Sequence, residues 1–288
     1  MEYADEVCAY GKALKAEFPN IKLIANPASS TTYNYWDWLE KFVAKTRGVV
    51  DFIDVHWYWG QGKSSFDYWL KNTPLQTGDK WKKEEWDRSY AEDIRLIKET
   101  CARAGEPNMG LVALEWNIGP SNGSEIFSQQ LIAVIQAEIL MEYLRDDVRL
   151  TCLWTLIWQT SRDVWSEQDF FPSIITQEPP FAPTLTLDMF RMFSPVRGKT
   201  VIASESSNYD LPVVATSDDA GHRVLLIINK NPLRRKVSIN LDKKVTLVTA
   251  EMIGLKHQVC QPQEISIENE KGLAFYAEPF SFTAIRIE

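Results

Sequence analysis

The sequence is poor in the residues that bind metals or form disulfides. It has four cysteines and three histidines among 288 residues. The cysteines are far apart and include no C-x-x-C pair, and the histidines lack the spacing of zinc ligands. Cys152 lies inside an apolar strand pattern, which is typical of a buried free thiol. We therefore expect no structural disulfide, no metal site and no cofactor.

Long apolar runs and an excess of positive charge are also absent. No stretch reaches the roughly 18 apolar residues that cross a bilayer, and residues 1–20 show a charged helical pattern rather than a cleavable signal. The balance of 31 Lys+Arg against 39 Asp+Glu is 31 − 39 = −8, which would repel a phosphate backbone. We expect a globular cytoplasmic protein that binds neither nucleic acid nor membranes.

Aromatic residues, in contrast, are abundant: the chain has 11 Trp, 10 Tyr and 13 Phe. Several of them cluster in segments that look like loops and strand ends, such as residues 57–59 and 154–158. Aromatic faces stack on the C–H faces of sugar rings, and sugar hydroxyls form hydrogen bonds with polar groups nearby. Packing in the core is the other explanation, and we expect it for about half of these residues.

The first two-thirds of the chain alternates helix and strand patterns. The apolar spacing predicts helices over residues 3–18, 36–45, 84–104, 126–144 and 185–193, and strands over residues 21–25, 51–59, 111–115 and 150–158. Four successive strand–helix units predict a parallel sheet, which amounts to half of a TIM-type (β/α) barrel. From about residue 200, short strands separated by turns predict a β-sandwich. We predict one domain over residues 1–197 and a second over residues 198–288.

The apolar run from Leu111 to Leu114 is the most informative segment, because it ends in the carboxylate of Glu115 and then turns into a loop. In a parallel barrel, chemistry takes place at the carboxyl ends of the strands. Glu115 is therefore the leading catalytic candidate. The simpler alternative is a strand-end glutamate that caps a loop or pairs with a lysine.

Side chains two positions apart on a strand face the same way, which decides which groups can meet. The rule groups Ala113 with Glu115, Asp54 with His56 and Tyr58, and Trp154 with Trp158. If these three faces open into one barrel mouth, a carboxylate, an imidazole and two indoles lie together there.

These features together resemble the second half of a glycoside hydrolase barrel. They are the run Asp51-Phe52-Ile53-Asp54-Val55-His56-Trp57-Tyr58, the later step Glu115-Trp116-Asn117, the strand ending in Trp158, and the β-sandwich. The group is the clan A of retaining enzymes, which keep their two catalytic glutamates at the ends of strands four and seven. The closest members are the family 51 arabinofuranosidases and the family 39 xylosidases. The resemblance implies that the four strands here are strands five to eight, with strands one to four absent.

The resemblance also implies roles for individual residues. Glu115 matches the nucleophile of strand seven, and His56 matches the strand-six histidine that lines the sugar subsite. Trp158 or Trp154 matches the aromatic platform of strand eight. The further candidates for substrate binding are Tyr58, Trp116 and Asn117.

The second catalytic carboxyl group is not securely identified. In the resembling family the acid/base glutamate ends strand four, just before a helix like residues 3–18, and this chain begins at Met1 without that strand. Retaining hydrolysis needs two carboxyl groups ~5–5.5 Å apart. The possible donors are Glu2, Asp163 and Glu167. Each has a simpler explanation, since Glu2 suits a helix N-terminus and the other two suit an exposed loop.

A half barrel leaves strand edges unpaired and one apolar face uncovered. We therefore expect either a homo-oligomer whose half barrels cover each other, or a fragment completed by another polypeptide that carries the missing half. The leading hypothesis for function is a retaining glycosidase that acts on O-glycosidic bonds of a carbohydrate substrate. The alternative is a carbohydrate-binding or scaffold protein that has lost hydrolysis. Sugar binding by the sandwich alone has less support, because residues 200–288 contain no tryptophan.

Overall fold

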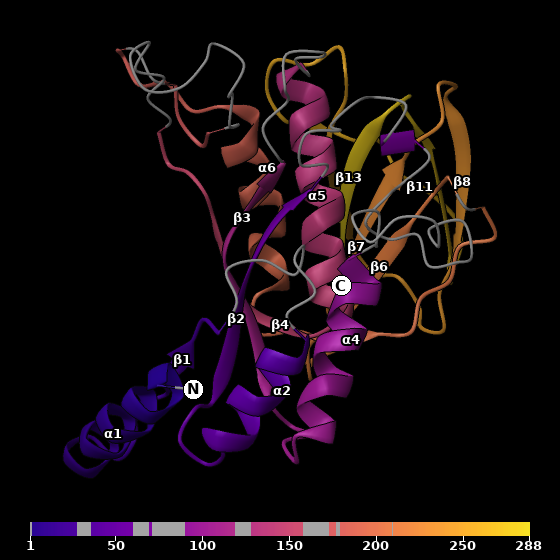
Figure 1. Cartoon of the computed structure of the whole chain (residues 1–288). Coiled ribbons are helices and arrows are strands. Elements are labelled where there is room, and N and C mark those ends of the chain that lie inside the picture. The colour runs from indigo at the N-terminus through magenta and orange to yellow at the C-terminus, as the bar shows by residue number, and fades with distance from the viewer. Residues whose placement is uncertain are drawn as a thin grey trace. The chain divides into compact units, whose positions relative to one another are not determined.

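The structure is a computed structural model, and it describes residues 2–27, 36–59, 69–70, 90–118, 128–157, 173–176, 179–208 and 210–288 (Figure 1). The chain forms two compact units. The first comprises Met1–Trp59, Pro74–Asn117 and Asp146–Trp154, and the second comprises Gly60–Thr73, Ile118–Arg145 and Thr155–Glu288. The units are built from interleaved segments, and the domain boundary at residue 197 stays a prediction.

The first unit is built on a four-stranded parallel sheet. Its strands are β1 (Ile24–Ala25), β2 (Phe52–Trp59), β3 (Gly110–Ile118) and β4 (Val148–Leu153). They lie in the order β1-β2-β3-β4, so sequence neighbours are also neighbours in space, as successive crossover units require. The predicted half barrel is therefore confirmed.

Among the described residues, three helices belong to this unit: α1 (Glu2–Glu17), α2 (Trp36–Lys45) and α4 (Tyr90–Arg103). Helix α2 buries Leu39, Phe42 and Val43, which the helical repeat brings to one face. The ring of Tyr3 on α1 stacks on Phe42, with ring centres 5.5 Å apart. The prediction for residues 36–45 is confirmed at both ends, whereas residues 84–89 of the predicted third helix lie outside the described residues.

Asp51 ties α1 to the first two strands. Its carboxylate accepts a hydrogen bond from the amide of Leu23 at 2.8 Å, and it pairs with Lys15 at 2.8 Å and Lys22 at 3.3 Å. Burial alone would raise the pKa of Asp51, but the hydrogen bonds from Lys15, Leu23 and Lys22 hold it below its usual value. The start of β2 is thereby fixed against α1.

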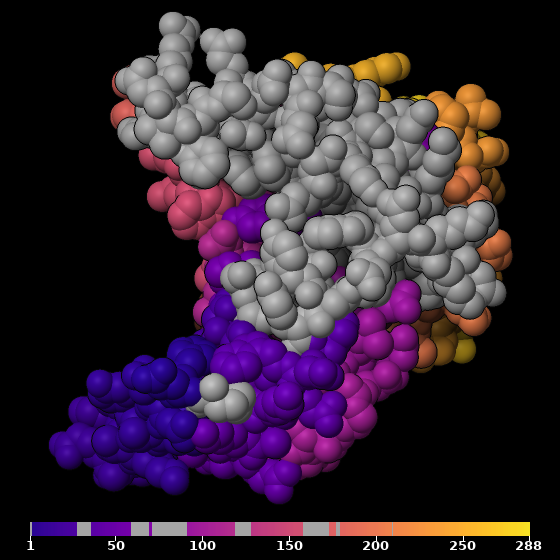
Figure 2. Space-filling model, in the orientation of Figure 1, coloured from indigo at the N-terminus to yellow at the C-terminus, as the bar shows by residue number. Residues whose placement is uncertain are grey.

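Helix α1 also carries an apolar face that is open to solvent. Tyr10, Leu14 and Phe18 are 71%, 44% and 54% exposed, and their spacing of four residues aligns them along one side. Figure 2 shows this N-terminal segment as the indigo part of the molecular surface. Large apolar side chains aligned in this way mark a surface suited to contact with another chain.

The second unit contains two antiparallel sheets. The strands are β5 (Thr200–Ile202), β6 (Val213–Ser217), β7 (Arg223–Asn229), β8 (Arg235–Asn240), β9 (Val248–Ile253), β10 (Gln261–Pro262), β11 (Ser266–Asn269), β12 (Gly272–Ala277) and β13 (Ser281–Ile287). Six strands form one sheet in the order β10-β9-β13-β7-β6-β5, and three form the other in the order β11-β12-β8. The predicted β-sandwich is confirmed.

Both faces of the six-stranded sheet are covered. On one face Leu225, Ile227 and Ile285 pack against Leu273 and Phe275 of the smaller sheet. The other face contacts α5 (Gln129–Arg145) and α6 (Leu185–Phe193), which a short 3₁₀ turn, η4 (Ser194–Val196), follows. The second unit therefore has three layers, which explains why every residue of β7 is buried.

A buried ion pair lies within the second unit. Glu138 on α5 and Lys230, which directly follows β7, are 3.3 Å apart, and their side chains are 0% and 3% exposed. Lys230 donates to the backbone oxygen of Trp69 at 2.8 Å, and the Trp69 indole N–H donates to Glu138 at 2.7 Å. The two charges are thus paired and hydrogen-bonded, as buried charges must be.

The structure corrects the prediction for Cys152. This residue was expected to be buried, but it is exposed, and all four cysteines are free thiols. The strand that carries it, β4, pairs only with β3 among the described residues, and its burial pattern alternates toward solvent. Within the same residues, no helix is both long and apolar enough to cross a bilayer.

Candidate functional site

The two oxygens of Glu115 face two side chains from the neighbouring strand. The hydroxyl of Tyr58 donates a hydrogen bond to Oε1 of Glu115. Nδ1 of His56 lies 3.5 Å from Oε2, and the side chains of His56 and Glu115 are 26% and 29% exposed. The Glu115 carboxylate is therefore held on both oxygens, yet it remains open to solvent.

The local sequence explains this meeting. His56 and Tyr58 are two residues apart on β2, so they face the same way, and Glu115 lies on β3, which is next to β2 in the sheet. The pairing of β3 with β4 shifts register between Ala113 and Trp116, so Glu115 lies at an irregular point of its strand. Irregular pairing of this kind re-aims a side chain near the end of a strand.

His56 lies between two carboxylates. Its Nε2 is 3.2 Å from Oδ2 of Asp54, on the side of the ring opposite to the nitrogen near Glu115. A neutral imidazole has one N–H and can donate to only one of the two, whereas the protonated ring can donate to both. The tautomer of His56 therefore decides which of the two carboxylates the neutral ring can donate to.

Asp54 on β2 links this strand to β1 and β3. It is 5% exposed and accepts hydrogen bonds from the side-chain amide of Asn26 at 2.9 Å and from the backbone amide of Leu114 at 2.8 Å. Asn26 directly follows β1. Asn26 was not among the predicted site residues, and its position at the end of a parallel strand is the signal that could have identified it.

Tyr58 acts as a hydrogen-bond donor toward Glu115. Burial, the hydrogen bond to Glu115 and the charge of Glu115 together raise the pKa of Tyr58 far above its usual value. The phenol stays protonated throughout the working range of an enzyme, so Oε1 of Glu115 always has a hydrogen bond to accept.

The three residues proposed for the rim beyond Glu115 differ in exposure. Trp116 and Asn117 are both 0% exposed, whereas Trp154 is 43% exposed. The side-chain amide of Asn117 donates to the backbone oxygen of Trp154 at 2.5 Å. Trp154 is thus the one of the three that presents its ring to solvent, and Asn117 holds the backbone that carries it.

Of the remaining candidates, the structure describes only Glu2. Glu2 is an exposed first residue of α1, and no contact of Glu2 with Glu115 is observed among the described residues. Trp158, Asp163 and Glu167 lie outside the part of the chain that the structure describes. The roles assigned to all site residues stay predictions.

Comparison with known proteins supports a hydrolase fold. Residues 5–86 match the family model of the glycosyl hydrolase catalytic core. No curated protein matches the chain in sequence. The similarities to solved structures are much more extensive.

Three of these structures illustrate the similarity. A family 51 α-L-arabinofuranosidase from Bifidobacterium longum has a TM-score of 0.73 and 16% identity, covering 100% of this chain and 63% of its own. An α-L-arabinofuranosidase from Thermotoga maritima has a TM-score of 0.70 and 16% identity, with 100% and 62% covered. A family 44 xyloglucanase from Paenibacillus polymyxa has a TM-score of 0.70 and 13% identity, with 99% and 60% covered.

The chain thus spans less than two thirds of the length of these enzymes, while nearly all of it is matched. Identities this low establish the fold and leave the activity to be argued from the site. The predicted resemblance is confirmed at that level: the chain has a partial barrel and antiparallel sheets like those of these glycoside hydrolase structures.

Proposed function

We propose that this protein is a retaining glycosidase that cleaves O-glycosidic bonds with Glu115 as the nucleophile. The observation that supports this most directly is the pair of side chains on the Glu115 oxygens, the Tyr58 hydroxyl on Oε1 and the His56 ring on Oε2. A carboxylate of purely structural use would be expected to pair with a lysine or arginine. Among the described residues no such side chain contacts Glu115, which is partly exposed beside the Tyr58 hydroxyl.

In the proposed mechanism Glu115 attacks the anomeric carbon and forms a covalent glycosyl-enzyme, while an acid protonates the departing oxygen. Water then breaks the glycosyl ester as the same acid, now a base, takes its proton. The Tyr58 hydrogen bond orients Glu115 so that the second oxygen can attack. His56, held by Asp54 at 3.2 Å, aligns that second oxygen or binds a sugar hydroxyl.

The acid must come from elsewhere than the described cluster. Asp54 is the carboxylate on the far side of His56, but it is buried and accepts bonds from Asn26 and Leu114. The acid is therefore supplied by a loop, where Asp163 and Glu167 remain candidates, or in trans. Glu2, although exposed, remains the third candidate.

Supply in trans agrees with the surface of the first unit. Among the described residues the edge strands β1 and β4 each pair with one neighbour, and Tyr10, Leu14 and Phe18 form an uncovered apolar face. We propose that a second copy or a complementing chain covers these features in the active assembly. A cytoplasmic location remains part of this proposal.

The test uses aryl glycosides, beginning with α-L-arabinofuranosides and β-xylosides. Glu115→Gln should lower kcat by roughly 10³-fold or more, because the amide cannot form the covalent intermediate. Glu99→Gln is the matched control, since Glu99 is an exposed partner of Arg95 on α4 and should leave turnover unchanged. Equal hydrolysis by both variants would remove Glu115 from the mechanism.

Two further measurements complete the test. Proton NMR of the first product should show the anomeric configuration of the substrate, and inversion would exclude the covalent route. If the sugars bind in calorimetry but no aryl glycoside is hydrolysed by the assembled protein, the chain is a carbohydrate-binding protein instead.

A further inference from the structure

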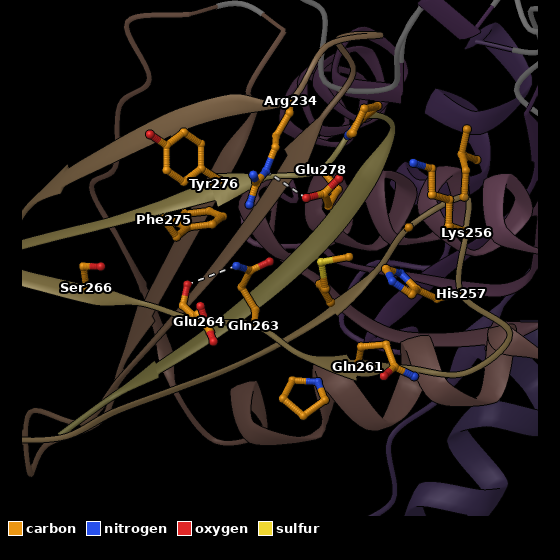
Figure 3. Close-up of a pocket in the computed structure, with 15 residues that line it drawn as sticks. Arg234, Lys256, His257, Gln261, Gln263, Glu264, Ser266, Phe275, Tyr276 and Glu278 are labelled. Atoms are coloured by element: carbon orange, nitrogen blue, oxygen red, sulfur yellow. Dashed lines mark hydrogen bonds and ion pairs between the residues drawn. The ribbon is translucent and has the colours of Figure 1, made fainter.

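A pocket of about 760 Å³ lies entirely within the second unit (Figure 3). Its walls come from the end of β9 and the loop after it, from β10 to β12, and from the segments around Arg234 and Glu278. The volume falls within the range of about 300–1,000 Å³ that small-molecule sites occupy. Neither the family match nor the Glu115 cluster involves these residues.

One wall carries an aromatic ring that is held in place. Tyr276 on β12 is 49% exposed, and the guanidinium carbon of Arg234 lies 4.6 Å from the centre of its ring. Arg234 is in turn paired with Glu278 at 2.9 Å, which Figure 3 shows beside it. The ring is thus fixed on a paired strand before any ligand arrives, which lowers the entropic cost of binding.

The other walls carry both donors and acceptors of hydrogen bonds. Lys256 and His257 lie on the loop after β9, and Gln263 and Glu264 lie near the middle of the pocket in Figure 3. Nδ1 of His257 is buried and has no hydrogen-bond partner among the described residues. An unpartnered buried nitrogen is costly unless a ligand or water satisfies it.

This composition selects among ligand classes. The carboxylates of Glu264 and Glu278 balance the charges of Arg234 and Lys256, so the pocket has no excess of positive charge that would favour a phosphate or another compact anion. Sugar hydroxyls both donate and accept, so they can use Gln263 and Glu264 as well as Lys256 and His257, while a pyranose or furanose face packs on an aromatic ring. The absence of tryptophan from residues 200–288 does not exclude such a site, because Tyr276 supplies the ring.

We propose that the pocket lined by Arg234, Tyr276, His257 and Gln263 binds a segment of an oligosaccharide. The site is made of other residues than the Glu115 cluster and does not depend on hydrolysis there. It would retain a polysaccharide on the protein whether or not the chain is cleaved.

Calorimetric titration of the full chain with xylohexaose, arabinohexaose and cellohexaose tests this site. Glu115→Gln is the parent protein, so that no probe is consumed. At least one probe should bind the parent, and Tyr276→Ala should weaken that binding about tenfold. Leu247→Ala removes an exposed apolar side chain outside the pocket and should leave the affinity unchanged.

Gln263→Ala is a second pocket variant that keeps the aromatic ring, and it should also weaken binding. It tests the pocket even if the Tyr276→Ala protein does not fold. Binding that is unchanged in both pocket variants, or no binding of any hexasaccharide to the parent at millimolar concentration, overturns the proposal. In the protein that retains Glu115, Tyr276→Ala should leave the turnover of a small aryl glycoside unchanged. The proposed hydrolysis and the proposed oligosaccharide binding are therefore tested by different measurements, and either proposal can fail without the other.

Discussion

Replacing Lys230 by methionine tests how strongly the second unit depends on its buried ion pair. The Lys230 ammonium is 3.3 Å from both carboxylate oxygens of Glu138 and lies 4.5 Å from the centre of the Trp69 ring. Methionine has a similar length without the charge, so Glu138 would keep the hydrogen bond from Trp69 but lose its counter-charge. Removing one partner of a buried pair costs about 3–5 kcal/mol, which we expect as the loss of unfolding free energy.

The measurement is urea unfolding followed by circular dichroism and by tryptophan fluorescence, with coincident transitions required for a two-state analysis. The control is Lys244→Met, because Lys244 and Glu270 form an exposed pair at 3.0 Å whose side chains are 62% and 74% exposed. Loss of that pair should cost less than about 1 kcal/mol.

The double variant Lys230→Met/Glu138→Gln separates charge from packing. The glutamine side chain that replaces Glu138 is neutral, and its amide oxygen can still accept from the Trp69 indole. The double variant should therefore lose much less stability than the sum of the two single variants. Two results would refute the view that an uncompensated charge causes the loss of unfolding free energy. One is a double variant whose loss equals the sum of the single losses, and the other is a Lys230→Met protein as stable as Lys244→Met.

Two other predictions concern the first unit. Asp51→Asn should cost about 1.5–3 kcal/mol at neutral pH through its weakened contacts with Lys15 and Leu23. Because the folded pKa of Asp51 lies below the usual 3.8, this stability is present above the unfolded pKa and lost as pH falls through the folded one. The difference in unfolding free energy between the parent and the Asp51→Asn protein should therefore disappear as the pH is lowered in unfolding titrations. A difference that is independent of pH would contradict the role given to the Asp51 carboxylate. Tyr58→Phe should lower kcat on aryl glycosides about tenfold or more by removing the donor to Glu115. Since the pKa of Tyr58 is raised, the alkaline limb of the pH–rate profile should be the same in both proteins, and a limb lost in the variant would mean that Tyr58 titrates.

The strongly periodic elements could be predicted from the sequence. The helices at residues 36–45 and 185–193 have the predicted ends, because the apolar residues of each, such as Leu39 and Phe42, repeat on one face. The neighbouring positions of Tyr58 and Glu115 followed from the alternation of side chains on two adjacent parallel strands. In both cases a local pattern reports directly on the environment of the side chain.

Other features depend on contacts between distant segments, which no local pattern records. Strands β10 to β12 were not predicted. Residues 261–271 are mostly glutamine and charged residues, the apolar run of β12 is short, and these strands acquire order by pairing with one another and with β9 and β8. Cys152 was expected to be buried because apolar residues surround it in sequence, but β4 is an edge strand of the described sheet. The Tyr276 pocket arises from loops that meet only in the folded chain.

The position of Asp54 has a practical consequence for protein engineering. The carboxylate of Asp54 contacts Asn26, His56 and Leu114 at once, so a library that varies residue 54 disturbs contacts among three neighbouring strands before it samples any new specificity. Randomising Trp154 instead changes an indole that already faces water, with the framework left intact. Directed evolution of ligand preference should therefore begin at residue 154 and keep aspartate at residue 54.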